Sequence, residues 1–256
     1  MSEPLYDKGH ISFLEMLWGE GYLSPGGRDE VSRVLAGLDL RGARVLDIGC
    51  GSGAITLSLA QDHGAGHVTG IDVEEDVIAA ARARIDAADA TAQVTIQMVT
   101  PGPFPHEDGA FDVVFSKDSI IHIHDKEFLA REAFRVLAPG GWVAASDWLM
   151  AGEAPSPQMA TYLALEDLDF GIASPDRYSA ALEAAGFTQI TLTNRNAWYL
   201  GVARDELILL ETRRDALAEA HGAEFIDHSI RTWRAMVDVL ETGEHCPHHI
   251  RAQKPS

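Results

Sequence analysis

A glycine-rich turn between an apolar strand and a helix is the first part of the sequence that could bind a ligand. Gly49, Gly51 and Gly53 follow the apolar run Arg44-Val-Leu-Asp-Ile48, and a helix-forming segment begins at Ala54. Glycine lets the backbone turn sharply, and it lets a ligand approach closely because no Cβ is in the way. The first N–H groups of the following helix are unpaired and can face that ligand. The turn alone is a weak signal, since ordinary strand-to-helix turns are also rich in glycine.

Two acidic residues strengthen this interpretation. Asp47 lies in the end of the first strand, and a second apolar strand, His67-Val-Thr-Gly-Ile71, is followed by Asp72. Asp72 comes about 20 residues after the turn, the spacing at which an acidic residue binds a ribose diol in nucleotide-binding folds. The pattern therefore predicts a site for a ligand that carries a nucleoside.

A second polar segment follows the predicted strand at 111–115. It reads Ser-Lys-Asp-Ser-Ile-Ile-His-Ile-His-Asp-Lys over residues 116–126. Ligands bind at the carboxyl ends of parallel strands, so this segment should face the same site. An imidazole with its ordinary pKa near ~6.5 can take a proton at neutral pH, and a carboxylate attracts a cation. His122 and Asp118 could thus deprotonate and hold an amine, although the residue types alone favour a structural or capping histidine.

The runs Val45-Leu-Asp-Ile-Gly-Cys-Gly-Ser-Gly53 and Gly70-Ile-Asp72 together resemble the cofactor site of class I S-adenosylmethionine (SAM) methyltransferases. The resemblance covers residues 40–150. It implies a Rossmann-like α/β fold, in which a seven-stranded, mostly parallel sheet carries N-terminal leader helices and a helical cap. It also implies SAM as cofactor and S-adenosyl-L-homocysteine as product. In the family, the glycine loop packs on the methionine part of SAM and the acid after the second strand binds the ribose. The cofactor residues expected here are Asp47, Gly49, Gly51, Asp72 and Val73.

Two further segments resemble the phosphoethanolamine N-methyltransferases. Trp18-Gly-Glu-Gly-Tyr-Leu-Ser-Pro-Gly-Gly27 is similar to the segment before their first strand, and residues 116–126 are similar to their Ser-Arg-Asp…Ile-Leu-His…Asp-Lys segment. Sarcosine and dimethylglycine methyltransferases have a segment related to the second. In the family, a tyrosine and a histidine pair over the reacting amine, and an aspartate contacts it. The matching residues here are Tyr6 and His122 as catalytic residues, Asp118 at the substrate, and Ser24 and Lys117 at SAM.

The sequence departs from this family at two places. After the strand at 94–98, relatives usually have an aspartate for the adenine amine, and here Thr100 or backbone groups would take its place. In the cap, the phosphoethanolamine enzymes hold the phosphate with tyrosines and basic residues. The chain has apolar and acidic residues there instead, namely Trp148, Ala164, Leu168, Phe170, Glu166, Asp167 and Asp169. Such groups are poor phosphate ligands, although the acidic ones could equally form a solvated helix face. We therefore expect a non-phosphorylated acceptor, with Trp148 in its site.

Other polar residues are given smaller roles. The cluster His245-Cys-Pro-His-His249 is too compressed for the usual zinc spacings, so no metal site is expected. It also resembles the closing strand of methyltransferases. His124 has no family match and is expected at the surface. Three arginines could hold a substrate carboxylate, but nothing in the sequence places them near the pocket: Arg195, Arg231 and Arg234.

Composition bounds the protein class. With 256 residues, 46% of them hydrophobic, the chain fits a single methyltransferase domain. A net charge of −19 disfavours nucleic acid and anionic membranes as partners. Two cysteines, no signal peptide and no membrane-length apolar run predict a cytoplasmic protein. The expected parts are a leader or lid at 1–41, a SAM-binding core at 42–148, a cap at 149–175, and the rest of the sheet with a helical insertion at 176–256.

Apolar periodicity predicts the elements that position these residues. Strands are expected at 94–98, 111–115, 140–147, 187–193 and 248–252, in addition to the two before residue 73. Helices are expected at 11–18, 29–40, 74–88, 127–137, 176–185, 204–219 and 224–240.

The predicted function is SAM-dependent methylation of the nitrogen of a small, non-phosphorylated amine or amino acid. The alternatives are a phosphoethanolamine-type N-methyltransferase, methylation at oxygen, sulfur or carbon of another metabolite, and a SAM-binding protein that does not methylate. The sequence leaves the acceptor and the oligomeric state open.

Overall fold

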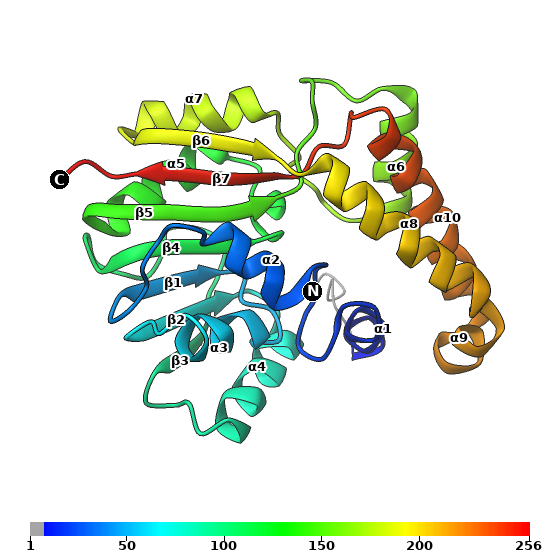
Figure 1. Cartoon of the computed structure of the whole chain (residues 1–256), viewed down its shortest axis with the longest axis horizontal. Helices are drawn as coiled ribbons and strands as arrows, with labels where there is room; N and C mark the ends of the chain where they lie inside the picture. Colours follow the sequence, from blue (N-terminus) through cyan, green and yellow to red (C-terminus); the bar gives the residue numbers. More distant parts are fainter. Residues whose placement is uncertain (1–7) are drawn as a thin grey trace.

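A seven-stranded sheet with the order β3-β2-β1-β4-β5-β7-β6 organises the computed structural model, which describes residues 8–256 (Figure 1). β1 to β5 run parallel, and β7 lies antiparallel between β5 and β6. This is the predicted seven-stranded, mostly parallel sheet. Its strands are β1 (Arg44–Ile48), β2 (His67–Asp72), β3 (Val94–Met98), β4 (Phe111–Lys117), β5 (Leu137–Asp147), β6 (Thr188–Asn194) and β7 (His248–Gln253).

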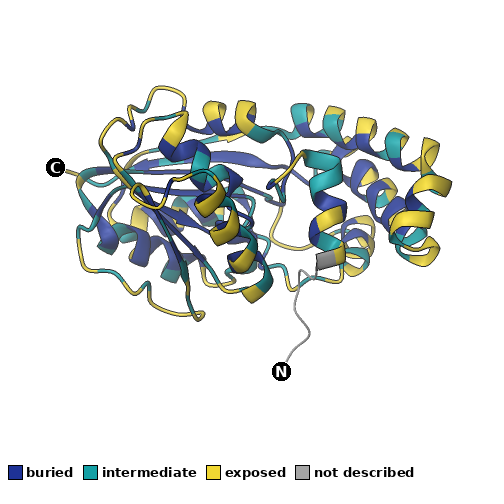
Figure 2. Ribbon diagram, turned by 90° about the horizontal axis from the view of Figure 1, so that it is seen from below, coloured by how far each residue is buried: buried dark blue, intermediate teal, exposed yellow. Residues whose placement is uncertain are grey.

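Helices cover both faces of the sheet, so the central strands are apolar on both sides. The helices form two groups, one on each face of the sheet. Val113 and Phe115 of β4 pack beneath the first group, and Val114 packs beneath the second. Successive side chains of a strand point to opposite faces, which explains the continuous apolar runs in the sequence. Figure 2 shows the buried sheet between helices that are exposed on their outer sides. The first group is α2 (Gly27–Val34), α3 (Ala54–Gln61) and α4 (Glu75–Ala87), and the second is α5 (Lys126–Val136) and α7 (Pro175–Ala185).

A helical extension projects beyond the edge at which the parallel strands end (Figure 1). Its own core contains Phe13, Tyr162, Tyr199 and Trp233, which are buried. None of the helices within residues 8–256 is both long and apolar enough to cross a membrane. The extension consists of α1 (Lys8–Trp18), α6 (Pro157–Glu166), α8 (Asn196–Thr212), α9 (Arg214–His221) and α10 (Ala223–Glu241).

Two helix predictions were wrong in their bounds. The helix predicted at 29–40 ends at Val34, because the chain turns at Gly37, whose φ of +85° a helix cannot contain. The helix predicted at 204–219 is two helices that meet at Arg213, and the first of them already begins at Asn196. The aromatic residues near this start have only moderate helix propensity, so packing against the extension decides their conformation.

A buried ion-pair cluster joins the leader to the end of the sheet. Glu30 of α2 accepts hydrogen bonds from Arg195 Nη2 at 2.8 Å and from His249 Nε2 at 2.7 Å. Burial opposes ionisation of Glu30, but these two bonds outweigh it and lower its pKa from 4.5 to about 2. The cluster therefore ties α2, β7 and the start of α8 together through one carboxylate.

Glu30→Gln should lower the free energy of unfolding by about 3 kcal/mol at neutral pH, since the shift in pKa measures the stabilisation that ionisation provides. Because the folded-state pKa is depressed, this stabilisation is present above pH 4.5 and is lost as the pH falls toward 2. Urea unfolding at several pH values tests both statements. Glu211→Gln, which breaks an exposed pair with Arg234, should cost less than about 1 kcal/mol. Equal losses in the two variants would contradict the assignment.

Candidate active site

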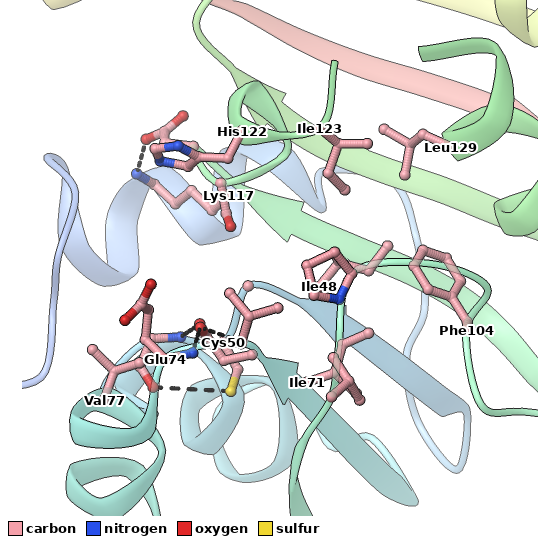
Figure 3. Close-up of a pocket in the computed structure, with 18 of the residues that line it drawn as sticks. Ile48, Cys50, Ile71, Glu74, Val77, Phe104, Lys117, His122, Ile123 and Leu129 are labelled. Carbon is pink, nitrogen blue, oxygen red and sulfur yellow. Dashed lines mark hydrogen bonds and ion pairs between the residues drawn. The ribbon is translucent and has the colours of Figure 1, made fainter. Parts of the chain in front are cut away.

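A cavity of about 500 Å³ opens at the carboxyl ends of β1, β2 and β4 (Figure 3). The glycine turn, the end of β2, the loop at 100–105 and the segment after β4 form its walls. It lies where open α/β sheets bind ligands. Most of the residues predicted for the site line it, namely Ser24, Gly49, Gly51, Asp72, Val73, Thr100, Lys117, Asp118 and His122.

The glycine turn is shaped by left-handed backbone conformations. Gly49 and Gly51 have φ values of +69° and +50°, which glycine adopts without steric cost. A Cβ on Gly49 would lie 1.7 Å from Ser119 Oγ, so no other residue fits there. The turn is anchored to β2, because the N–H groups of Gly49 and Cys50 both donate to the Ile71 carbonyl. The sequence feature thus forms a rigid wall of the cavity.

Asp72 is held at the end of β2 by backbone donors. Its carboxylate accepts from the N–H groups of Gly51 at 3.0 Å, Val73 at 2.7 Å and Glu74 at 3.1 Å. Burial raises the pKa of Asp72, and these three bonds oppose the rise. A carboxylate offers about four acceptor positions, so Asp72 keeps capacity for a ligand hydroxyl. The neighbouring Val73 side chain is 44% exposed and gives the wall an apolar surface.

Asp47 is the one predicted cofactor residue of the described part that the structure does not bring to the cavity. It is buried beneath the glycine turn and accepts a hydrogen bond from Thr56 Oγ1 of α3 at 2.6 Å. Burial raises its pKa to about 7. Its contact braces the turn against α3 from below.

The leader is fixed to the glycine turn by an arginine that the sequence analysis missed. Arg84 of α4 donates from Nε to the Ser52 carbonyl at 2.9 Å and from Nη2 to Glu15 at 3.2 Å. Glu15 also accepts from the N–H of Gly21 at 2.8 Å. These bonds hold the segment before β1 over the cavity and bring Ser24 into its wall. No local pattern in α4 signals this role.

Lys117 and Asp118 form a buried pair at the end of β4. Lys117 Nζ donates to Ser24 Oγ at 2.8 Å, to the Pro25 carbonyl at 2.8 Å and to Asp118 Oδ2 at 2.6 Å. Asp118 has a φ of +54°, and its Oδ1 accepts from Ser146 Oγ at 2.7 Å. Aspartate adopts this left-handed conformation more readily than most residues. The carboxylate is therefore fixed in one orientation, and Ser146 is a second residue that the sequence analysis missed.

His122 lies at the end of a short 3₁₀ turn, η1 (Ile120–His122), and is half-buried. Its ring is 5.2 Å from the Phe170 ring. Burial lowers the pKa of His122 below its ordinary 6.5, and the nearby backbone and carboxylate of Asp169 oppose this effect. The imidazole is thus neutral at neutral pH. Tyr6, its predicted partner, lies outside the described residues, while His124 is exposed, as predicted, and pairs with Asp169.

Trp148 packs in the cap instead of lining the cavity. Its ring lies 6.1 Å from Phe170, 5.6 Å from Tyr199 and 5.6 Å from His245. Trp148, which the sequence analysis expected in the acceptor site, therefore does not line the cavity. The Phe170 ring lies between it and His122.

The arginines that the sequence left unassigned lie away from the cavity. Arg195 pairs with Glu30, and Arg234 pairs with Glu211. Arg231 lines a surface groove between α8 and α10. Their positions make them unsuited to hold a substrate carboxylate at His122.

The histidine-rich segment at 245–249 is built into the fold. His245 is fully buried with Nδ1 against the Leu149 carbonyl, and burial lowers its pKa to about 4. His248 Nδ1 lies 2.6 Å from the Cys246 carbonyl, and His249 bonds to Glu30. Within residues 8–256, no group of three or more His, Cys, Asp or Glu side chains is arranged to hold a metal ion.

Comparison with known proteins identifies the family. Residues 45–141 match the model of a methyltransferase domain. The chain is 33% identical over 244 residues to the 27-O-demethylrifamycin SV methyltransferase of Amycolatopsis mediterranei, covering 85% of this chain and 86% of that protein. The chain belongs to the class I SAM-dependent methyltransferases. The family assignment and the use of SAM, both expected from the glycine turn and Asp72, are thereby confirmed.

Other relatives resemble the methyltransferase over much of its length. It is 32% identical over 231 residues to phosphoethanolamine N-methyltransferase 1 of Zea mays, covering 90% of this chain and 45% of that protein. The chain thus spans about half the length of the phosphoethanolamine N-methyltransferases of Zea mays and Triticum aestivum. A Haemonchus contortus phosphoethanolamine N-methyltransferase 2 shares its fold with a TM-score of 0.90 at 24% identity, covering 99% of this chain and 59% of that one. A sarcosine dimethylglycine methyltransferase structure from Galdieria sulphuraria gives 0.85 at 19% identity, with 97% and 99% coverage.

Proposed function

We propose that this methyltransferase transfers the methyl group of SAM to the nitrogen of a small, non-phosphorylated amine or amino acid. The observation that carries the proposal is the placement of Asp118 and His122 together in the cavity wall. An ammonium has no lone pair, so the acceptor must lose a proton before it attacks the methyl carbon. Asp118 attracts and orients the cation, and the neutral His122 accepts the proton. By resemblance to the family, Tyr6 pairs with His122 over the reacting amine.

In this proposal, the other lining residues hold SAM. Gly49 and Gly51 pack against its methionine part, and Asp72 accepts a hydrogen bond from the ribose. The apolar Val73 and the hydroxyl of Thr100 contact the nucleoside. The remaining cofactor ligands are Ser24 and Lys117, and Asp47 supports the glycine turn from below.

The surroundings of the acceptor position favour a cation without a phosphate. Lys117 is the only lysine or arginine among the described residues that line the cavity, and it is committed to Asp118. Behind the wall, aromatic rings stand with two carboxylates, Glu166 and Glu206, and burial raises the pKa of each to about 7. Aromatic rings and ionised carboxylates stabilise an ammonium group, whereas neither supplies the positive charge that phosphate binding uses.

Two alternatives have specific support. Similarity to the Zea mays phosphoethanolamine N-methyltransferase favours a phosphorylated amine, with donors supplied by residues other than those lining the cavity. Similarity to the 27-O-demethylrifamycin SV methyltransferase, which extends over most of both proteins, favours transfer to oxygen. His122 would accept the proton of a hydroxyl group in that case.

Release of S-adenosyl-L-homocysteine from SAM across an acceptor panel tests the proposal. The panel holds ethanolamine, glycine, sarcosine, dimethylglycine and larger amino acids beside phosphoethanolamine and its methylated forms. We expect turnover of a non-phosphorylated amine, with the added methyl on nitrogen by product fragmentation. Turnover confined to the phosphorylated amines, or a methyl found on oxygen, would overturn it. SAM binding without release on any acceptor would favour a protein that does not methylate.

A further inference from the structure

A buried lysine stands directly behind the turn that carries His122. Lys126, the first residue of α5, is 1% exposed. Its Nζ donates to the carbonyl of Ile120 at 2.7 Å and lies 5.2 Å from the centre of the Tyr178 ring. Ile120 is the first residue of η1, and His122 is the last. The ammonium therefore holds the start of the 3₁₀ turn through a residue that does not line the cavity.

A carboxylate of β5 faces the same buried layer. Asp147 is fully buried, and its Oδ2 accepts from the hydroxyl of Tyr178, while its Oδ1 has no hydrogen-bond partner among the described residues. Burial raises the pKa of Asp147 to about 7, and the charge of Lys126 opposes that rise. Asp147 directly follows Ser146, which fixes Asp118. Lys126 and Asp147 thus interact through space, and they lie next to the elements that carry His122 and Asp118.

Stability does not explain this arrangement. Removing charged groups from water is costly, and buried opposite charges can often be replaced together by apolar residues without loss of stability. The incompletely bonded Asp147 adds to this cost, since a buried unpaired acceptor is unfavourable. The hydrogen bond from Lys126 to the Ile120 carbonyl is the contact through which Lys126 can affect the position of His122, and hence the reaction.

We propose that Lys126 is a positioning residue for His122: its ammonium, balanced by Asp147, fixes η1 so that the imidazole faces the methyl acceptor. The inference rests on the proposed function, in which His122 accepts the proton. The positive charge also acts on the imidazole through space. Lys126 and His124 lower the pKa of His122, and Asp169 raises it. The charged groups that face Lys126 itself are Asp147, Arg177 and Glu127.

The chain contains a matched control. Lys254 also donates to backbone carbonyls, those of Phe134 and Leu137, at 2.8 and 2.7 Å. Its Nζ lies 4.6 Å from the centre of the Phe134 ring, so it repeats the carbonyl and ring contacts of Lys126 in a half-buried position. These partners belong to the last residues of α5 and the start of β5, at the other end of the helix from His122. Lys254 thus allows a comparison with a lysine whose carbonyl contacts lie at the end of α5 away from His122.

The test compares Lys126→Met with Lys254→Met in the full chain. For Lys126→Met we expect kcat to fall about tenfold or more, the loss of one hydrogen bond from a charged group, with the Kd for SAM within about twofold of the unchanged protein. The NMR titration of the His122 ring, assigned by its absence in His122→Ala, should move up toward 6.5. Lys254→Met should change neither quantity.

A Lys126→Met protein with the kcat and the His122 titration of Lys254→Met would overturn the inference. If Lys126→Met does not fold, the double variant with Asp147→Asn removes both buried charges and carries the same expectations. The two proposals fail separately, because full turnover in His122→Ala would remove the base, whereas the ring titration still reports whether Lys126 acts on His122.

Discussion

His122→Ala should lower kcat by about 10²-fold or more, the range expected for loss of a general base. SAM affinity should stay within about twofold, since the predicted SAM contacts lie on the glycine turn and at Asp72. The measurement is S-adenosyl-L-homocysteine release at saturating acceptor, with SAM binding followed by calorimetry. Burial holds the pKa of His122 below 6.5, so the unchanged enzyme should keep its kcat at neutral pH and lose it as the pH falls below that value.

His124→Ala is the matched control for this prediction. His124 belongs to the same segment but is exposed and paired with Asp169. Its removal should leave kcat within about twofold, because it contributes only an exposed ion pair. Full turnover in His122→Ala with unchanged SAM binding would show that this imidazole is structural, the interpretation that the residue types alone had favoured.

Asp72→Asn should weaken SAM binding by about 10²-fold. The carboxylate is proposed to accept a hydrogen bond from a ribose hydroxyl, and a bond to a charged group contributes about 1.5–3 kcal/mol. Asparagine keeps the shape but only one acceptor oxygen, so it can keep the bonds from the N–H groups of Val73 and Glu74 to Oδ1 but loses the bond from the N–H of Gly51 to Oδ2. Calorimetric titration with SAM gives the Kd of the variant.

The control for this variant lies three residues further on. Glu75→Gln changes an exposed carboxylate in the first turn of α4 and should leave the Kd for SAM within about twofold. An Asp72→Asn protein that binds SAM as tightly as Glu75→Gln would remove Asp72 from the ribose and assign that role to another lining group.

The cavity wall was predictable at positions where one short sequence pattern marks both the end of a strand and the residues that can bind a ligand there. The turn at Gly49 to Gly53 marks the end of a strand by its residue types, and Asp72 marks the end of the next. Parallel strands bring such ends together at one edge, so local patterns suffice to assemble the wall. Asp118 and His122, which follow β4, line the same cavity by the same rule.

Contacts between distant residues were not predictable in this way. Lys117 and Ser24 are 93 positions apart, and Arg84 and Glu15 are 69 apart. No periodicity relates such positions, because packing of the leader on the core decides which side chains meet. Trp148 shows the same limit. Its place after β5 suggested the acceptor site, but the loop that carries Phe170 lies between it and His122.

The position of β7 between β5 and β6 dictates the order in which the sheet can assemble during synthesis. β1 to β5 can pair as soon as each is made, because every one of them neighbours an earlier strand or the next one. β6 pairs with β7, and residues 195–247 separate these two strands in the sequence. β6 therefore cannot pair until α8, α9 and α10 have been synthesised and have folded back. The outer edge of β5 remains open for that whole interval. An open strand edge invites pairing with another chain, so a chain that ends within α8–α10 would expose the edge of β5 and be prone to aggregation.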